Sequence, residues 1–415
     1  MVKVDYRTGL NTAASTNRPP AINLTPFQLF CIRWSVFFDK TTDRLSPTET
    51  VFRTIQMSTM VITGLMTMTS VLFADNKKAL ESFTYFIICV FLLAISIFAI
   101  RTKRFNRHML LMIEEEFPSY DRPVPEDLRR KLTGIRTSYG DFTKRVILSY
   151  LALVVFEVQA TALVPLTAAW FTPTKLGTQS TQMVVMWFPG DTTQVEIYAF
   201  TFAIQYSIVL IVKTIITGTL CSFSFFVSQM IAEFEILAAY IEHAVEIVEF
   251  NRSTGRTTER ELLDHIRNCV KLHNRLIHFK DELNESYNYI ILLELMFSTL
   301  YFCLSAFNMI FVGSKFTIVK GLLTLSNYLT ELFIFCMYGS MVEDAHIHLL
   351  RASYGSAWYL QPIRCRNSLM MIMSRSQIPL QLTVGKVFLA SLPLFLSVLK
   401  VSYSGVNALR AANAK

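Results

Sequence analysis

Seven stretches of predominantly apolar residues recur along this chain, and each is close to the length of about 20 residues that a helix needs to cross a bilayer. A backbone in lipid must satisfy its own hydrogen bonds, so helices are the expected form of such stretches. Hydrophobic residues make up 52% of the chain and charged residues only 17%. The sequence therefore predicts an all-α membrane protein with seven transmembrane helices, at residues 50–73, 79–100, 146–170, 195–226, 287–313, 320–342 and 382–409.

Basic residues are distributed unevenly between the loops. Most Lys and Arg residues fall in segments 1–49, 101–145, 227–286 and 343–381, while the alternate loops contain only Lys77, Lys78, Lys175, Lys315 and Lys320. Because basic residues are retained on the inner side, we expect a cytoplasmic amino terminus and an extracellular carboxyl terminus. The first thirty residues lack a signal-peptide pattern, so the first span should target the chain. Three glycosylation sequons should then lie inside and stay unmodified, at Asn23, Asn251 and Asn284.

Motifs of enzymes and of metal sites are missing from the sequence. There is no Walker A pattern, dinucleotide glycine fingerprint, GxSxG elbow or HExxH pair. We therefore expect no catalytic residue, no metal and no cofactor. The net charge of +8 comes from loops between apolar stretches, which argues against nucleic-acid binding. None of the seven cysteines lies in loop 171–194, so free thiols are expected and the extracellular disulfide typical of a G-protein-coupled receptor is not.

The long inner segments are amphipathic. In 227–286, apolar residues recur at helical spacing, namely Leu262, Ile266, Val270, Leu272, Leu276 and Phe279. A helix that projects below the membrane must bury this stripe. Contact with another subunit makes oligomerisation the natural inference, and packing within one monomer is the alternative.

The outer halves of several spans are rich in aromatic side chains with a few hydroxyls and amides. This mixture suits a small apolar ligand with one polar group, and ordinary packing between helices is the alternative. The candidate ligand-binding residues are Phe83, Phe86, Gln159, Thr161, Tyr198, Phe202, Gln205, Tyr206 and Tyr328.

Charged and polar side chains also occur inside spans, where they are costly. Glu157 and Lys213 are the most interior, and the pattern leaves open whether they pair structurally or act in ligand binding or gating. In the last span, Thr383, Lys386, Ser397, Lys400, Ser404 and Asn407 would share one stripe of a continuous helix. Water contact explains two lysines on one stripe better than packing does. Since one helix cannot enclose a pore, several copies would have to meet around an axis.

The carboxyl-terminal third resembles the insect odorant receptors. The motifs are FCMYGS with Gly339, SYGSAWY with Tyr354 and Trp358, MSRSQIPL with Pro379, TVGKVF with Gly385, and LKVSYS with Lys400 and Ser404. Upstream, NCVKLHNRLIHF and MWFPGDTTQVEIYAF are similar to the approach to the fifth span and to the second outer loop of this family. The first 180 residues match only in span spacing and polarity.

The resemblance implies an odour-gated, non-selective cation channel of four subunits, with a pore formed by the last helix and an anchor formed by cytoplasmic helix ends. It implies partnership with the odorant co-receptor. It also implies that this chain is a ligand-binding tuning subunit, because the co-receptor has a longer second cytoplasmic loop than the segment 227–286. Implied pore and gate residues are Ser397, Lys400, Ser404, Val406 and Leu409. Implied anchor residues are Cys269, His273, Phe279, Tyr354, Trp358 and Pro379.

On this interpretation the chain divides into six parts: a cytoplasmic segment 1–49, spans and ligand-binding bundle 50–226, a helical anchor region 227–286, spans 287–342, an anchor segment 343–381, and a pore-lining span with a short tail 382–415. We expect a multi-pass plasma-membrane protein of olfactory neuron dendrites that contacts membrane lipid and binds a small volatile. A gustatory-type homomeric channel and a seven-span G-protein-coupled receptor are the alternatives. A transporter is disfavoured because no internal repeat is visible.

Overall fold

The computed structural model describes residues 47–73, 82–91, 93–95, 97, 108–110, 112–113, 124–171, 182–184, 186–188, 194–250, 259–312 and 315–413. These residues form an almost entirely helical protein. Its helices are α2 (Pro47–Phe73), the shorter Ser82–Ile95, α4 (Glu126–Phe171), α5 (Val195–Glu242), α6 (Ala244–Phe250), α7 (Glu259–Val312), α8 (Lys315–Gly355), the 3₁₀ turn η4 (Trp358–Leu360), α9 (Ile363–Ser376) and α10 (Leu392–Asn413). Its two short strands are β1 (Thr383–Val384) and β2 (Phe388–Leu389), which pair antiparallel.

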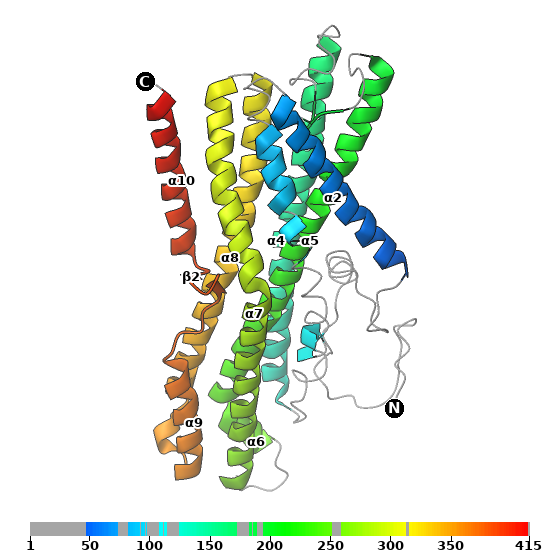
Figure 1. The fold of residues 1–415 in the computed structure, drawn as a ribbon. Coiled ribbons are helices and arrows are strands. Elements are labelled where there is room, and N and C mark those ends of the chain that lie inside the picture. Colours follow the sequence, from blue (N-terminus) through cyan, green and yellow to red (C-terminus); the bar gives the residue numbers. More distant parts are fainter. Residues whose placement is uncertain are drawn as a thin grey trace.

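Four long helices, α4, α5, α7 and α8, run side by side through the height of the molecule (Figure 1). The longest, α7, has 54 residues, which corresponds to about 80 Å at 1.5 Å per residue and exceeds the hydrocarbon thickness of a bilayer by far. All four are long and apolar enough to cross a membrane. The predicted spans 146–170, 195–226, 287–313 and 320–342 lie on these four helices. The first two predicted spans fall on the shorter apolar helices Met57–Phe73 and Ser82–Ile95.

The lower half of the bundle in Figure 1 has the most extensive core. Here α5 is buried almost all round, and the ring of Phe223 lies 4.9 Å from that of Phe335 and 5.5 Å from that of Tyr287. The amphipathic stripe of α7 faces this core: Leu262, Ile266, Leu272, Leu276 and Phe279 are all buried within the monomer, and Val270 packs against the same core. Packing within one monomer therefore accounts for that stripe.

The prediction of one continuous helix over 382–409 is wrong at its beginning. Residues 383–389 form the β1–β2 hairpin, and the helix α10 begins only at Leu392. Gly385 and Lys386 adopt left-handed backbone angles, with φ of 64° and 59°, which interrupt an α-helix. Thr383 and Lys386 are therefore not on the stripe of α10.

Asparagine side chains of α7 hold this hairpin in place. The Oδ1 atom of Asn284 accepts a hydrogen bond from the backbone N–H of Thr383 at 2.7 Å, and that of Asn288 accepts one from the N–H of Lys386 at 3.0 Å. The side chain of Asn284, which belongs to a predicted unmodified sequon, is thus occupied by a contact within the protein. These side-chain hydrogen bonds satisfy backbone N–H groups of the hairpin that would be satisfied by backbone carbonyl groups in a helix.

Candidate ligand-binding site

Two of the predicted ligand residues are buried on α5. Gln205 accepts hydrogen bonds on its Oε1 atom from the backbone N–H groups of Met183 (2.9 Å) and Val184 (3.2 Å). Tyr198 lies one helical turn from Phe202, with ring centroids 6.1 Å apart. The amide of Gln205 therefore fixes residues 183–184 against α5.

The remaining predicted residues do not converge on one cavity. Gln159 on α4 is exposed, and its Nε2 atom donates to the hydroxyl oxygen of Tyr206 on α5 at 3.0 Å. Phe83 is exposed as well, while Phe86 and Thr161 are half-buried. The aromatic pattern of the spans is thus divided between contacts inside the bundle and side chains on its apolar surface.

Tyr328 on α8 belongs to an aromatic column inside the bundle. Its ring centroid lies 5.0 Å from that of Tyr301 and 5.0 Å from that of Phe297. The ammonium group of Lys213 lies 5.1 Å from the Tyr328 ring centroid, a distance typical of a cation–π interaction. The column therefore connects the upper part of α7 and α8 with a charged cluster below it.

That cluster is built around an intramembrane ion pair. The Nζ atom of Lys213 on α5 lies 2.7 Å from Oε2 of Glu157 on α4, and both side chains are buried. Lys213 also donates to Oδ1 of Asn327 at 3.3 Å. Glu294 and Glu331 are buried close enough for their charges to interact with that of Lys213. Glu157 and Lys213, which the sequence left open, are paired, and the cluster contains three carboxyl groups around one ammonium group.

A small polar cavity lies at the end of the bundle where α7 ends and α8 begins, the upper end in Figure 1. It has a volume of about 30 Å³. Its lining combines the hydroxyl groups of Thr84, Tyr85, Tyr301, Ser305 and Thr324 with Asn308, Lys320 and Gly321. None of the predicted ligand residues lines it, although Tyr301 of the lining contacts Tyr328.

The loop segment 182–188 is bound to the cavity residues. The Nζ atom of Lys320 donates to the carbonyl oxygen of Gln182 at 3.2 Å, and the hydroxyl of Tyr85 donates to that of Met183 at 3.3 Å. Met183 is buried. Trp187 of the same loop is half exposed, and its backbone N–H donates to the carbonyl oxygen of Met66 at 3.3 Å. Residues 182–184 are therefore the part of this loop that reaches the cavity.

Sequence reasoning missed the cavity residues because single polar side chains in an apolar helix show no periodicity. Ser305 and Asn308 are three residues apart on α7, and Lys320 and Thr324 are four apart on α8. These spacings place each pair on one helix face. These spacings are visible in the sequence, but they indicate a shared cavity only when α7 is known to pack against α8.

The proposed pore residues lie on the last helix. Ser397, Lys400, Ser404 and Asn407 share an exposed face of α10, and Val406 is half-buried. Leu409 lies on α10, but its side chain is outside the described residues. α10 packs against α7 and α8 on one side only. Its polar stripe faces away from the monomer.

The proposed anchor residues divide into two groups. Cys269, His273 and Phe279 are buried in the monomer's own core, so they cannot contact another subunit directly. Tyr354 and Pro379 are exposed, and Trp358 is half-buried. The six cysteines in the described residues, Cys269 among them, are free thiols.

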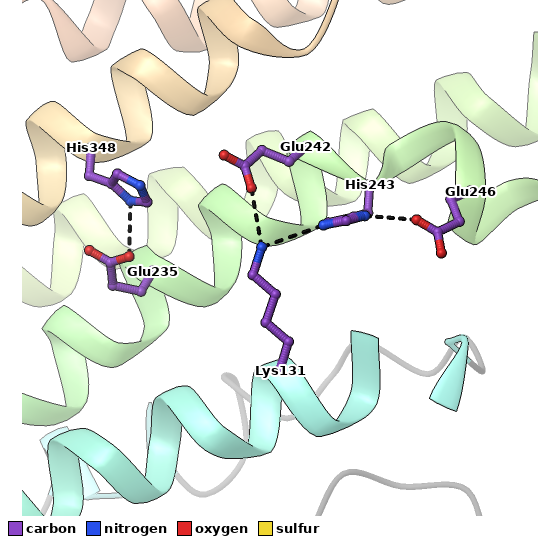
Figure 2. Close-up of polar contacts among 6 residues, drawn as sticks. All are labelled: Lys131, Glu235, Glu242, His243, Glu246 and His348. Carbon is purple, nitrogen blue, oxygen red and sulfur yellow. Dashed lines mark hydrogen bonds and ion pairs between the residues drawn. The ribbon is translucent and has the colours of Figure 1, made fainter. Parts of the chain in front are cut away.

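Polar side chains join the helices at the lower end of the bundle (Figure 2). Lys131 of α4 lies 3.5 Å from Oε2 of Glu242 of α5, and His243 lies 2.7 Å from Glu246 of α6. Nδ1 of His348 on α8 lies 2.9 Å from Oε2 of Glu235 on α5. Burial raises the pKa of Glu235, and the neighbouring His348 opposes this shift. These contacts fix the relative positions of α4, α5, α6 and α8 outside the predicted spans.

Two buried histidines of this region predict acid sensitivity. The rings of His273 and His346 stack 5.8 Å apart, and burial, reinforced by Arg375, lowers the pKa of each to about 4. The unfolded chain takes up these protons near pH 6.5, so their contribution to stability is complete above pH 6.5 and declines as the pH falls toward 4. We expect the unfolding temperature of the detergent-solubilised protein to fall by a few degrees between pH 7 and pH 5.

Replacing both buried rings by phenylalanine should make this decline shallower. His278, which is exposed on α7, provides the control, because His278→Phe should leave the pH profile unchanged. An equally steep decline in the double variant would contradict the assignment to His273 and His346.

Comparison with known proteins identifies the family of this fold. The family model of the 7tm odorant receptors matches residues 75–403. Odorant receptor 10 of Aedes albopictus is 25% identical over 214 residues, which cover 50% of this chain and 56% of that one. Odorant receptor Or2 of Anopheles gambiae is 31% identical over 169 residues, 38% of this chain and 42% of that one. The matched region spans about half the length of these relatives.

The fold is also that of a solved structure. The insect olfactory receptor OR5 from Machilis hrabei, determined in complex with eugenol, superimposes with a TM-score of 0.75 over 93% of this chain and 96% of that one, at 18% sequence identity. The described helices therefore form the same architecture over nearly the whole length of both chains. By its sequence match, the chain belongs to the 7tm odorant receptor family.

Proposed function

We propose that this chain is the odorant-binding subunit of a ligand-gated, non-selective cation channel. It has seven spans, a cytoplasmic amino terminus and an extracellular carboxyl terminus. It is located in the plasma membrane of olfactory neuron dendrites. The observation that carries the channel proposal is the stripe of Ser397, Lys400, Ser404 and Asn407 on the exposed face of α10. A polar stripe on a membrane helix is stable where it meets water or a partner.

The odorant binds in the outer half of the bundle. Support comes from the polar cavity, the loop segment 182–184 bound to it, and the aromatic column of Tyr301, Tyr328 and Phe297 beneath it. Ligand sites combine such apolar walls with a few oriented polar groups. The insect olfactory receptor OR5, which has the same fold, was determined in complex with eugenol, a small aromatic molecule. Preferential binding to the open arrangement would shift the population toward it.

Four subunits surround the pore, this chain together with the odorant co-receptor. The support is a series of exposed apolar side chains between the end of α8 and the hairpin: Tyr354 in the last turn of α8, then Tyr359, Leu360, Ile363, Met371 and Ile378. They lie beyond the predicted span 320–342, in a segment that faces water rather than lipid. Apolar side chains gathered on such a surface mark a protein–protein interface. The buried residues Cys269, His273 and Phe279 serve this anchor by fixing the fold behind it.

The test is membrane current in cells that express this chain alone and together with the insect co-receptor. A panel of volatile terpenoids, esters, alcohols and aldehydes should evoke cation current only in the paired cells. Lys400→Glu replaces a positive by a negative charge along the ion path, which should raise the permeability of divalent cations relative to monovalent ones. The reversal potential should then shift toward the equilibrium potential of the divalent cations. Lys271→Glu, on an exposed position of α7, is the control that should leave the reversal potential unchanged.

Each of the other outcomes identifies an alternative class. Current from this chain alone points to a homomeric, gustatory-type channel. Silence in both cells, together with glycosylation of Asn23, points to an extracellular amino terminus and a G-protein-coupled receptor. Either result removes the proposal of a tuning subunit.

A further inference from the structure

The polar cavity between the helix Ser82–Ile95, α7 and α8 contains an unsatisfied acceptor. The Nδ2 atom of Asn308 donates to Oγ1 of Thr84 at 3.0 Å, which fixes the orientation of the amide. Its Oδ1 atom has no hydrogen-bond partner among the described residues, and the side chain is only 5% exposed. Buried polar atoms are nearly always hydrogen-bonded. The amide oxygen therefore requires a donor inside this cavity.

The same cavity presents donors. Lys320, 5% exposed, carries three N–H donors and no acceptor. One of these donors is directed at the carbonyl oxygen of Gln182. The hydroxyl of Tyr301 interacts with those of Ser305 on α7 and Thr324 on α8, two of the helices that form the walls. A group in the cavity thus meets an acceptor from Asn308 and a donor from Lys320.

The acceptor of Asn308 and the donor of Lys320 together determine which ligand groups the cavity can bind. A hydroxyl group both donates and accepts, so it can donate to Asn308 and accept from Lys320 at the same time. An ester or aldehyde oxygen only accepts and would leave the amide oxygen of Asn308 without a donor, and a hydrocarbon would leave it so as well. The volume of about 30 Å³ exceeds the roughly 10–15 Å³ that a cavity needs to hold one water molecule. One hydroxyl group fits, and Tyr85 and Tyr301 are the aromatic residues of the cavity lining.

We propose that this cavity is the subsite for the hydroxyl group of an alcohol or phenol odorant, with Asn308 as acceptor and Lys320 as donor. This inference rests on the proposed odorant-binding function and narrows its ligand class. The site also has a direct mechanical link, because Lys320 and Tyr85 hold the carbonyl groups of Gln182 and Met183. A hydroxyl that competes for these donors would act on the segment 182–184.

The test compares alcohols with their methyl ethers, which keep the carbon skeleton and the accepting oxygen but lose the donor. The probes are 1-hexanol, 2-phenylethanol and 4-methylphenol, each beside its ether, applied to cells with this chain and the co-receptor. We expect active alcohols to evoke half-maximal current at roughly tenfold lower concentration than their ethers. Asn308→Leu should abolish this difference by weakening the alcohol response while the ether response persists.

Gly321→Ala is a second variant, which does not remove a polar group. Its added methyl would lie 3.0 Å from Oγ of Ser305, so it narrows the cavity within an intact helix and should give the same selective loss. Gly134→Ala is the control, because a methyl at that helical glycine meets nothing within 4 Å. It should change neither response.

Equal potency of alcohols and ethers in the unaltered receptor overturns the inference while the receptor function stands. The inference also fails if Asn308→Leu and Gly321→Ala weaken both members of each pair alike. If no odorant evokes current, the proposed function fails, and thermal unfolding of the purified protein decides about the cavity. The subsite is supported if 1-hexanol stabilises the protein more than hexyl methyl ether does and if Gly321→Ala removes this difference. The subsite is overturned if the two compounds stabilise the protein equally.

Discussion

Lys213→Met is expected to lower the free energy of unfolding by about 3–5 kcal/mol, because it leaves a buried carboxylate without its partner. Lys213 is the one ammonium group within contact distance of Glu157 among the described residues, at 2.7 Å, and both side chains lie inside the bundle. Glu294 and Glu331 are buried near the same charge, so the substitution leaves a cluster of three buried carboxyl groups without its ammonium group. The measurement is reversible unfolding of the purified protein in mixed micelles.

Two further variants distinguish a broken ion pair from a packing defect. Lys213→Met combined with Glu157→Gln removes both charges, and a large part of the stability should return, since an uncharged pair has no uncompensated charge to bury. Lys271→Met replaces an exposed lysine of α7 and should change stability by less than about 0.5 kcal/mol. A double variant that is as unstable as Lys213→Met alone would show that shape, rather than charge, determines the loss.

This ion pair illustrates what the sequence can and cannot predict. The cost of charge in lipid identifies Glu157 and Lys213 as groups that need a partner or a cavity, but only the packing of α4 against α5 shows that they meet each other. The same limit applies to the cavity. Ser305 and Asn308 appear in the sequence as isolated polar residues in an apolar span, and their role depends on which helix lies opposite.

The helices could be predicted from the sequence better than the segment that precedes the last helix, α10. Apolar length locates the long helices α5, α7 and α8, because burial in lipid requires continuous helix. Residues 382–391 are equally apolar, yet they form a hairpin. Two asparagines of α7, about 100 residues away in sequence, supply the hydrogen bonds that make this alternative stable. Hydropathy does not detect such a distant compensation.

Gly339→Ala is expected to displace this hairpin and with it the start of α10. A Cβ atom at residue 339 of α8 would overlap the carbonyl oxygen of Ala390 and lie 2.8 Å from its carbonyl carbon. These are backbone atoms, and the N–H of Ala390 is bonded to the carbonyl oxygen of Leu382 at 2.8 Å, so the segment cannot yield by a side-chain rotation. Overpacking typically costs about 1–3 kcal/mol, and a clash with backbone atoms should fall at the upper end of this range. We expect that loss in the unfolding of the purified variant, together with loss of odour-evoked current in cells where it reaches the surface.

The loss of current is expected because the contact between Gly339 and Ala390 lies next to the start of α10. Directly after Ala390, the N–H of Leu392 donates to Oγ of Ser340, the neighbour of Gly339, at 3.0 Å, and this bond fixes the first turn of α10 on α8. α8 also carries Lys320 and Tyr328 nearer its other end, so a rigid α8 would join the proposed odorant region to the proposed pore helix. Gly355→Ala, on the same helix where a methyl meets nothing within 4 Å, should retain both stability and current. If Gly339→Ala conducts and unfolds like the unaltered receptor, the hairpin is not the element that couples α8 to α10.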